Sequence, residues 1–98
     1  MLINIIEYAR FNQLNSHTES VNSIKISTDK STIFSGSDDK TIRIWKAVTG
    51  ECVRVLEGHT DWVYSIAISA DASTIFSGSR DKTICIWKAA TGECVRTL

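Results

Sequence analysis

The chain has 98 residues, and its eleven basic and eleven acidic side chains cancel. This balance gives no electrostatic reason to expect nucleic acid or an anionic membrane as the partner. Isoleucine, valine and threonine together supply 29 residues (13, 6 and 10), and proline is absent. This composition favours β-strands over helices. We therefore expect a small all-β domain without a nucleic-acid or membrane partner.

The chain divides into a short leader and two copies of one unit. Residues 1–14 precede the copies and could supply an outer strand to a neighbouring unit, or could be unrelated to the repeat. Residues 17–56 align with residues 59–98 without a gap, and 30 of the 40 aligned pairs are identical. The sequence thus predicts an N-terminal extension followed by repeats over residues 15–56 and 57–98.

Each copy contains four short strand signals separated by turn residues. In the first copy the predicted strands cover residues 21–27, 32–37, 41–45 and 52–56. Connections of a few residues are typical of hairpins, so each copy should form a four-stranded antiparallel meander. One such sheet cannot bury both of its faces, and its apolar residues must stack on a neighbouring unit. The aromatic residues expected in the core are Phe34, Phe76, Trp45 and Trp87.

Two strings of the sequence resemble the signature of the WD-repeat family. They are S-G-S-D-D-K-T-I-R-I-W over residues 35–45 and S-G-S-R-D-K-T-I-C-I-W over residues 77–87, and Gly58-His59 fits the same pattern. The resemblance covers residues 15–98 and implies two four-stranded antiparallel blades of a β-propeller. Propellers typically close with four to eight blades. Two blades therefore leave an incomplete ring unless the chain oligomerises, with three or four copies, is part of a longer chain, or completes the ring of another protein.

Each copy also carries a histidine, a serine and an aspartate, the residue types of an acyl-transfer triad. The presence of the full set in both copies argues against catalysis, as does the lack of a G-x-S-x-G nucleophile elbow. The resemblance implies instead a structural hydrogen-bond network inside each blade, which includes the strand tryptophan. Its members are His17, Ser35, Asp39 and Trp45 in the first copy and His59, Ser77, Asp81 and Trp87 in the second. We predict no catalytic residues.

The cysteines give no sign of a disulfide framework or a metal site. Cys52, Cys85 and Cys94 form an odd set without the close C-x-x-C pairs that bind zinc. This pattern fits a reducing compartment. The start of the chain lacks a basic leading region and a cleavage site, and we expect a cytoplasmic or nuclear protein without metal or cofactor.

Three of the ten pairs that differ between the copies point to a binding surface. The pairs are Ser20/Trp62, Asn22/Tyr64 and Asp38/Arg80. In the resembled family these positions line the top rim around the central channel. The second copy thereby presents tryptophan, tyrosine and arginine, the residue types most enriched at binding hot spots. We predict that these six residues bind a protein or peptide partner, with Arg80 contacting an anionic group. The alternative for Trp62 is packing within the blade.

These features predict a non-enzymatic WD-repeat scaffold that mediates protein–protein interaction through the top rim. One alternative is an architectural unit that self-assembles, a homo-oligomer if these 98 residues are the full chain. Another is a sensor fragment of a larger signalling protein. A ligand-binding or catalytic propeller is the weakest alternative, because the two copies offer few differing polar residues that could line a channel.

Overall fold

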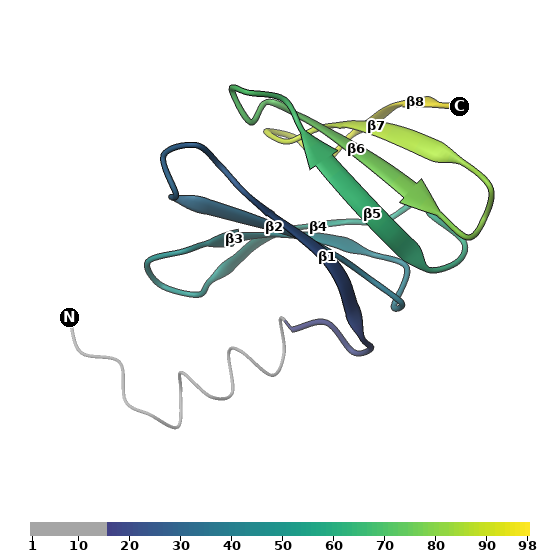
Figure 1. The fold of residues 1–98 in the computed structure, drawn as a ribbon, viewed down its shortest axis with the longest axis horizontal. Helices are drawn as coiled ribbons and strands as arrows, with labels where there is room; N and C mark the ends of the chain where they lie inside the picture. The colour runs from purple at the N-terminus through teal and green to yellow at the C-terminus, as the bar shows by residue number, and fades with distance from the viewer. Residues whose placement is uncertain (1–15) are drawn as a thin grey trace.

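The computed structural model describes residues 16–98 and consists of two antiparallel four-stranded sheets, one for each repeat (Figure 1). We call them blade 1 and blade 2. The strands follow the chain order in both sheets: β1 (Val21–Ile26), β2 (Thr32–Ser37), β3 (Ile42–Lys46) and β4 (Cys52–Leu56), then β5 (Val63–Ile68), β6 (Thr74–Ser79), β7 (Ile84–Lys88) and β8 (Cys94–Thr97). The predicted all-β fold is confirmed. The expected extension over residues 1–14 lies outside the described residues.

Short hairpins join the strands, and each of them places one residue in the left-handed region of backbone conformation. In blade 1 these residues are Lys30, Lys40 and Gly50, with φ values of 64°, 76° and 75°. The β1–β2 turn is held by Asp29, whose Oδ1 accepts hydrogen bonds from the hydroxyls of Ser27 and Ser31, both at 2.7 Å. Such local bonds offset the strain of a lysine at positive φ. No helix in the described part of the chain is long and apolar enough to cross a bilayer.

The hydrophobic core lies between the blades, where β5 packs against β1 and β2. We call the two contacting surfaces the rear face of blade 1 and the front face of blade 2. The rear face is formed by Phe34, Gly36, Ile42, Ile44 and Leu56, and the front face by Val63, Ile66, Ile75 and Trp87. All of these side chains are buried. Within the described residues, the stacking that a single sheet requires thus occurs once, between the rear face of blade 1 and the front face of blade 2.

The other two large faces are uncovered within residues 16–98, and the aromatic residues show the effect. Phe34 on the rear face of blade 1 is 1% exposed, whereas its repeat equivalent Phe76 is 39% exposed. Trp87 is buried and its equivalent Trp45 only partly so. The expectation that all four aromatics lie in the core is therefore wrong for Phe76, because no blade packs on the rear face of blade 2.

Candidate functional site

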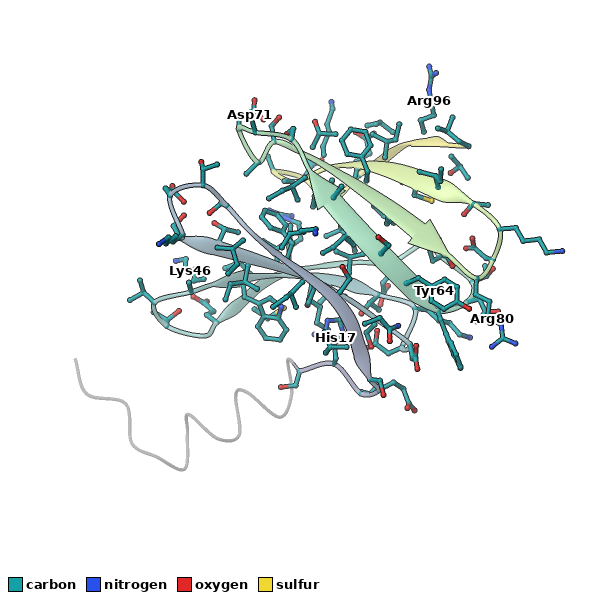
Figure 2. The ribbon with its side chains drawn as sticks, in the orientation of Figure 1. His17, Lys46, Tyr64, Asp71, Arg80 and Arg96 are labelled. Carbon is teal, nitrogen blue, oxygen red and sulfur yellow. The ribbon has the colours of Figure 1, made fainter. Side chains whose placement is uncertain are left out.

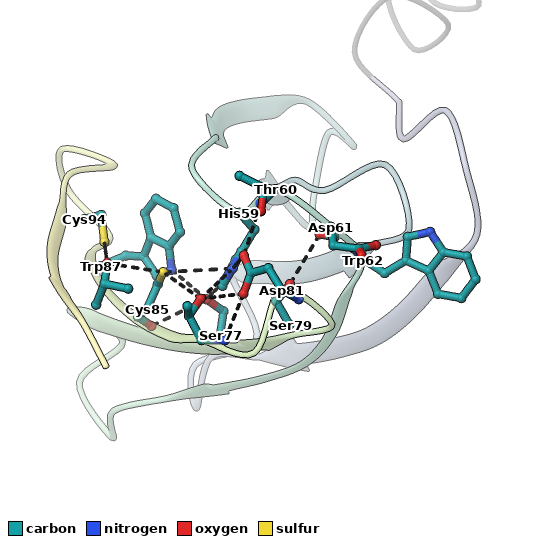
Figure 3. A network of polar contacts seen from close by, with 12 residues as sticks. His59, Thr60, Asp61, Trp62, Ser77, Ser79, Asp81, Cys85, Trp87 and Cys94 are labelled. Carbon is teal, nitrogen blue, oxygen red and sulfur yellow. Dashed lines mark hydrogen bonds and ion pairs between the residues drawn. The ribbon is translucent and has the colours of Figure 1, made fainter.

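The first candidate site is the triad-like set, which the hairpins of blade 2 bring together from distant parts of the sequence (Figure 3). His59 precedes β5, Ser77 lies in β6, Asp81 lies in the β6–β7 turn and Trp87 lies in β7. The Nδ1 atom of His59 is 2.8 Å from Oδ2 of Asp81, and its Nε2 atom is 2.6 Å from Oγ of Ser77. The indole Nε1 of Trp87 donates to the same Oγ at 2.8 Å. The four side chains form one continuous chain of hydrogen bonds.

The chemistry of these groups determines where the protons lie. An indole N–H can only donate and an ionised carboxylate can only accept. His59 therefore carries its proton on Nδ1 and donates it to Asp81, and Nε2 accepts the hydroxyl proton of Ser77. Ser77 in turn accepts from Trp87, and it is almost fully buried. This serine is engaged on both sides and enclosed by the blade, which suits a structural role and leaves no access for a substrate.

Blade 1 repeats the network with the same geometry. Nδ1 of His17 lies 2.8 Å from Oδ2 of Asp39, and Nε2 lies 2.6 Å from Oγ of Ser35. Trp45 donates to that Oγ at 2.8 Å. Paired catalytic groups that act as an acid and a base need environments that push their pKa values apart. The two networks have equal geometry and equal partners, so they do not form such a pair.

A threonine two residues after each aspartate completes the network, and the sequence interpretation missed it. The hydroxyl of Thr41 donates to Oδ1 of Asp39 at 2.5 Å, and its backbone N–H donates to the same oxygen at 2.9 Å. Thr83 does the same for Asp81, at 2.5 and 2.9 Å. The available signal was the string D-K-T, which both copies contain. Each carboxylate thus receives donors at both of its oxygens.

These hydrogen bonds change the acidity of the aspartates. Burial disfavours the ionised form of Asp39, but the hydrogen bonds from Thr41 and His17 and from two backbone amides outweigh it and lower its pKa from 3.8 to about 2. The same balance lowers the pKa of Asp81. Both carboxylates are therefore ionised in the folded protein well into the acid range.

The lowered pKa values predict how stability depends on pH. A carboxylate whose pKa is lower in the folded state contributes stability above its unfolded pKa, about 3.9, and loses it as the pH falls through the folded value. We expect the free energy of unfolding to fall between about pH 4 and pH 2 and the Asp39→Asn variant to show a shallower fall. Urea unfolding at a series of pH values measures both. Equal slopes for the two proteins would contradict the assignment.

The second candidate site is the predicted rim, and its residues from the second copy lie at one end of blade 2. Figure 2 shows Tyr64 and Arg80 together at this end, opposite the turn that holds Asp71. The rings of Trp62 and Tyr64 meet edge to face with centroids 6.4 Å apart, and the Cζ atom of Arg80 lies 4.7 Å from the centroid of the Trp62 ring. Trp62 and Tyr64 are 39% and 49% exposed. The structure therefore brings the three residues into one exposed cluster, which we call the rim cluster.

Asp61, which aligns with Glu19 of the first copy, also belongs to this end of blade 2. Its Oδ2 lies 3.9 Å from Nε of Arg80, and its Oδ1 accepts a hydrogen bond from the backbone N–H of Trp62 at 2.7 Å. An exposed ion pair of this length contributes little to stability, about 0–1 kcal/mol. Arg80 is thus held over the indole without being committed to a buried partner.

The matching residues of blade 1 have partners within the chain. Asn22 donates from Nδ2 to Oδ1 of Asp38 at 2.7 Å and to the backbone oxygen of Val63 at 2.9 Å. The backbone oxygen of Ser20 accepts from the N–H of Asp38 at 2.9 Å. Asn22 therefore joins blade 1 to blade 2, and the six predicted rim residues divide into an apolar, cationic half on blade 2 and a polar, anionic half on blade 1.

Metal-binding groups do not gather in the described part of the molecule. Among residues 16–98 no three side chains of histidine, cysteine, aspartate or glutamate come close enough to hold a metal ion together. The three cysteines are all free thiols, and burial raises the pKa of the Cys85 thiol.

The described blades resemble a solved structure. The chain superposes on the "Structure of U3-55K" with a TM-score of 0.79 and 30% sequence identity, over 85% of this chain and 25% of that one. The match thus rests on most of this chain and on a quarter of a larger protein.

Curated relatives match single repeats. The "Probable E3 ubiquitin ligase complex SCF subunit sconB" of Arthroderma otae is 50% identical over 40 residues, which are 41% of this chain and 6% of that protein. The "Ribosome biogenesis protein BOP1 homolog" of Drosophila grimshawi is 50% identical over 41 residues, 42% of this chain and 5% of that protein. The chain spans a small part of the length of these relatives. The family profile described as "WD domain, G-beta repeat" matches residues 9–46 and 50–88. This chain belongs to the WD-repeat (WD40) family.

Proposed function

We propose that the chain is a non-enzymatic interaction scaffold that holds a protein or peptide segment at the rim formed by Trp62, Tyr64 and Arg80. The observation that carries this proposal is the exposure of all three side chains in one contiguous cluster. An exposed tryptophan is uncommon unless it contacts something. The adjacent polar residues Ser20, Asn22 and Asp38 would form the border of the same site.

The geometry of the rim cluster suggests what it binds. An indole and a phenol ring at right angles offer two apolar surfaces that a partner's side chain can cover, at low cost in conformational entropy. Arg80 lies over the indole with its long contact to Asp61, so a partner's carboxylate can replace Asp61 as its acceptor. A segment that carries an apolar side chain next to an acidic one matches this arrangement.

The names of the curated relatives support a protein as the partner. Two of them are named as a subunit of a ubiquitin ligase complex and as a ribosome biogenesis protein, and both names point to assemblies of several proteins. The balanced charge of the chain gives nucleic acid and membrane no electrostatic advantage. We place the chain in the cytoplasm or nucleus, where its free cysteines stay reduced.

Substitution of the rim cluster tests the proposal. Peptides selected from a randomised display library against the whole chain serve as probes, and their affinities are measured by calorimetry. Trp62→Ala should weaken binding by about 30-fold, the loss expected at an interface hot spot. Arg80→Glu should weaken acidic peptides most, because it places a like charge against them.

Lys82→Glu provides the matched control, since it reverses a charge two residues away in the same hairpin. It should leave the affinity nearly unchanged. Wild-type affinity in both rim variants, or an equal loss in all three, would overturn the rim as the binding site.

A second candidate function is that of an architectural unit that assembles with copies of itself. The observation that favours it is the pair of uncovered apolar faces, one on each blade, with Val21, Ile24, Phe76 and Ile84 all exposed. Faces of this kind are uncommon on a protein that works alone in water. A mass above 10.9 kDa in light scattering coupled to size exclusion would support this function, and a monomer at all concentrations would exclude it.

A further inference from the structure

Each blade leaves one apolar face uncovered within residues 16–98. The uncovered front face of blade 1 includes Val21 and Ile24, which are 51% and 57% exposed, whereas their equivalents Val63 and Ile66 on the covered front face are 0% and 2% exposed. On blade 2 the uncovered rear face includes Ile84, which is 48% exposed, whereas its equivalent Ile42 is fully buried. The two uncovered faces therefore carry apolar residues at the same repeat positions that are buried on the two covered faces.

At their core positions the uncovered faces have the same residues as the faces that already pack together, except that Arg43 stands where blade 2 has Cys85. The rear faces carry Phe34, Gly36, Ile42, Ile44 and Leu56 on blade 1 and Phe76, Gly78, Ile84, Ile86 and Leu98 on blade 2. The front faces carry Val63, Ile66, Ile75 and Trp87 on blade 2 and Val21, Ile24, Ile33 and Trp45 on blade 1. The chain thus exposes both halves of an interface that it also forms internally.

The internal interface shows how closely the two halves fit. A methyl group built on Gly36 would lie 2.7 Å from Cγ1 of Val63, so the valine packs directly on the backbone of the glycine. The backbone N–H of Ile66 donates to Oγ of Ser23 at 3.4 Å. At the outer strands, Nη1 of Arg54 donates to the backbone oxygen of Thr91 at 3.2 Å. The blades are therefore aligned by this apolar contact, by these two polar contacts and by the hydrogen bond from Asn22 to Val63.

We propose that two copies of the chain join head to tail, with the front face of blade 1 of one copy packed on the rear face of blade 2 of the next. This proposal rests on the second function proposed above, assembly, and specifies its interface. The contact repeats the internal one, with Val21 of the second copy on Gly78 of the first. A methyl group built on Gly78 meets nothing within 4 Å in the single chain, so the space for that valine is open.

Two of the polar contacts of the internal interface, those made by Ser23 and Arg54, also have their residues in place between copies. Ser65 is the equivalent of Ser23 and would accept from the backbone N–H of Ile24 of the second copy. Arg96 is the equivalent of Arg54 and would donate to the backbone oxygen of Thr49 of the second copy. Apolar and polar contacts thus specify the same register for the two copies.

Three of the ten exchanges would make the contact between copies weaker than the internal one. Tyr64 replaces Asn22, whose amide bridges the blades within the chain. Lys30 replaces Ala72, which packs against the core, and Arg43 replaces the buried Cys85. The first loses a hydrogen bond and the other two bring charged groups near an apolar contact, which costs free energy of desolvation. We therefore expect association that depends on concentration within the range of ordinary biochemical measurement.

A contact between two different faces has a consequence for the assembly. Such a heterologous interface leaves one free face at each end of a dimer, so copies add until a ring closes. Propellers typically close with four to eight blades, so a closed ring of this chain would hold about two to four copies. The rim clusters would then repeat around one end of the ring.

Two substitutions block the two faces separately. Val21→Asp places a charge on the front face of blade 1, and Gly78→Ala fills the space on the rear face of blade 2. Light scattering coupled to size exclusion should show multiples of 10.9 kDa for the wild-type chain and single 10.9 kDa protomers for each variant. Thr28→Asp is the matched control, because its equivalent Ala70 stays exposed beside blade 1. This variant should keep the wild-type mass.

Mixing the two variants tests the head-to-tail arrangement itself. The Val21→Asp copy keeps an intact rear face and the Gly78→Ala copy keeps an intact front face, so one sound interface can form between them. The mixture should give dimers of twice 10.9 kDa and nothing larger. If either variant is unfolded alone, recovery of the strand signal in circular dichroism on mixing replaces the mass as the expected result.

The outcomes separate this interface from assembly in general. A wild-type chain that stays monomeric at every concentration overturns both. Wild-type oligomers that persist in Val21→Asp and Gly78→Ala overturn this interface and leave assembly standing. A mixture that forms no dimers and regains no strand signal overturns the head-to-tail contact. Loss of the oligomer in Thr28→Asp overturns the assignment of the contact to the front face of blade 1.

Discussion

Gly36→Ala is expected to lower the free energy of unfolding by about 1–3 kcal/mol, the usual cost of overpacking a core. The new methyl group would lie 2.7 Å from Cγ1 of Val63. That side chain is fully buried and β-branched, so it cannot turn away without leaving its preferred rotamer. Relief requires β2 and β5 to move apart, which opens the contact between the blades.

The repeat supplies a control with the same chemical change in the same strand context. Gly78→Ala adds its methyl group to the uncovered rear face of blade 2, where nothing lies within 4 Å. Its free energy of unfolding should be unchanged or higher by up to about 1 kcal/mol, because alanine loses less backbone entropy than glycine. Both variants are compared by urea unfolding in the Val21→Asp background, so that association does not contribute. Equal effects at the two glycines would contradict the packing of β5 on β2.

Asp81→Asn is expected to destabilise blade 2 by about 1–3 kcal/mol, because buried donors lose their acceptor. Oδ2 of Asp81 accepts from Nδ1 of His59 and from the backbone N–H of Thr60, and Oδ1 accepts twice from Thr83. An amide offers one oxygen and places an NH₂ group against the remaining donors. If His59 shifted its proton to Nε2 to avoid this clash, it would then oppose the hydroxyl proton of Ser77.

Asp71→Asn makes the same exchange in an exposed turn and serves as the control. Oδ1 of Asp71 accepts three hydrogen bonds in this turn, from the hydroxyls of Ser69 and Ser73 and the backbone N–H of Ser73. An amide can keep that oxygen in place, so we expect little change. Thermal unfolding followed by circular dichroism compares the two variants. An unfolding midpoint of Asp81→Asn that equals that of the wild type would contradict the claim that the network stabilises the blade.

Trp62 and Arg80 of the rim cluster lie apart from the two uncovered faces, which allows one chain to use both surfaces. Trp62 and Arg80 lie at the end of blade 2, while Val21 and Gly78 lie on the flanks where blades stack. Head-to-tail contact through the flanks leaves Trp62 and Arg80 open, while Tyr64 lies at the border of the contact, in the position that Asn22 holds between the blades. A Trp62→Ala chain that still assembles and a Val21→Asp chain that still binds peptide would demonstrate this independence.

Much of the fold could be predicted from the sequence because the signals are local and repeated. The four strands of each blade follow from alternating β-branched residues and short turns, and the third strand shifts by only one residue, to Ile42–Lys46. The contact of His59 with Asp81 could be proposed from the family resemblance. Thr83 was missed, because a threonine in a strand is ordinary and only the hairpin geometry places its hydroxyl on the carboxylate.

The tertiary structure decided what the repeat could not. Phe34 and Phe76 have the same neighbours in sequence, yet one is buried and the other exposed, because burial depends on whether another blade packs on that face. The position of Arg80 over Trp62 likewise follows from the register of β5 and β6, in which Val63 faces Ser79. The sequence by itself determined the repeat unit, its strands and the members of its network, since these depend on residues within one unit. The tertiary structure alone shows which faces and which rim residues stay exposed, because this depends on how the two units pack against each other.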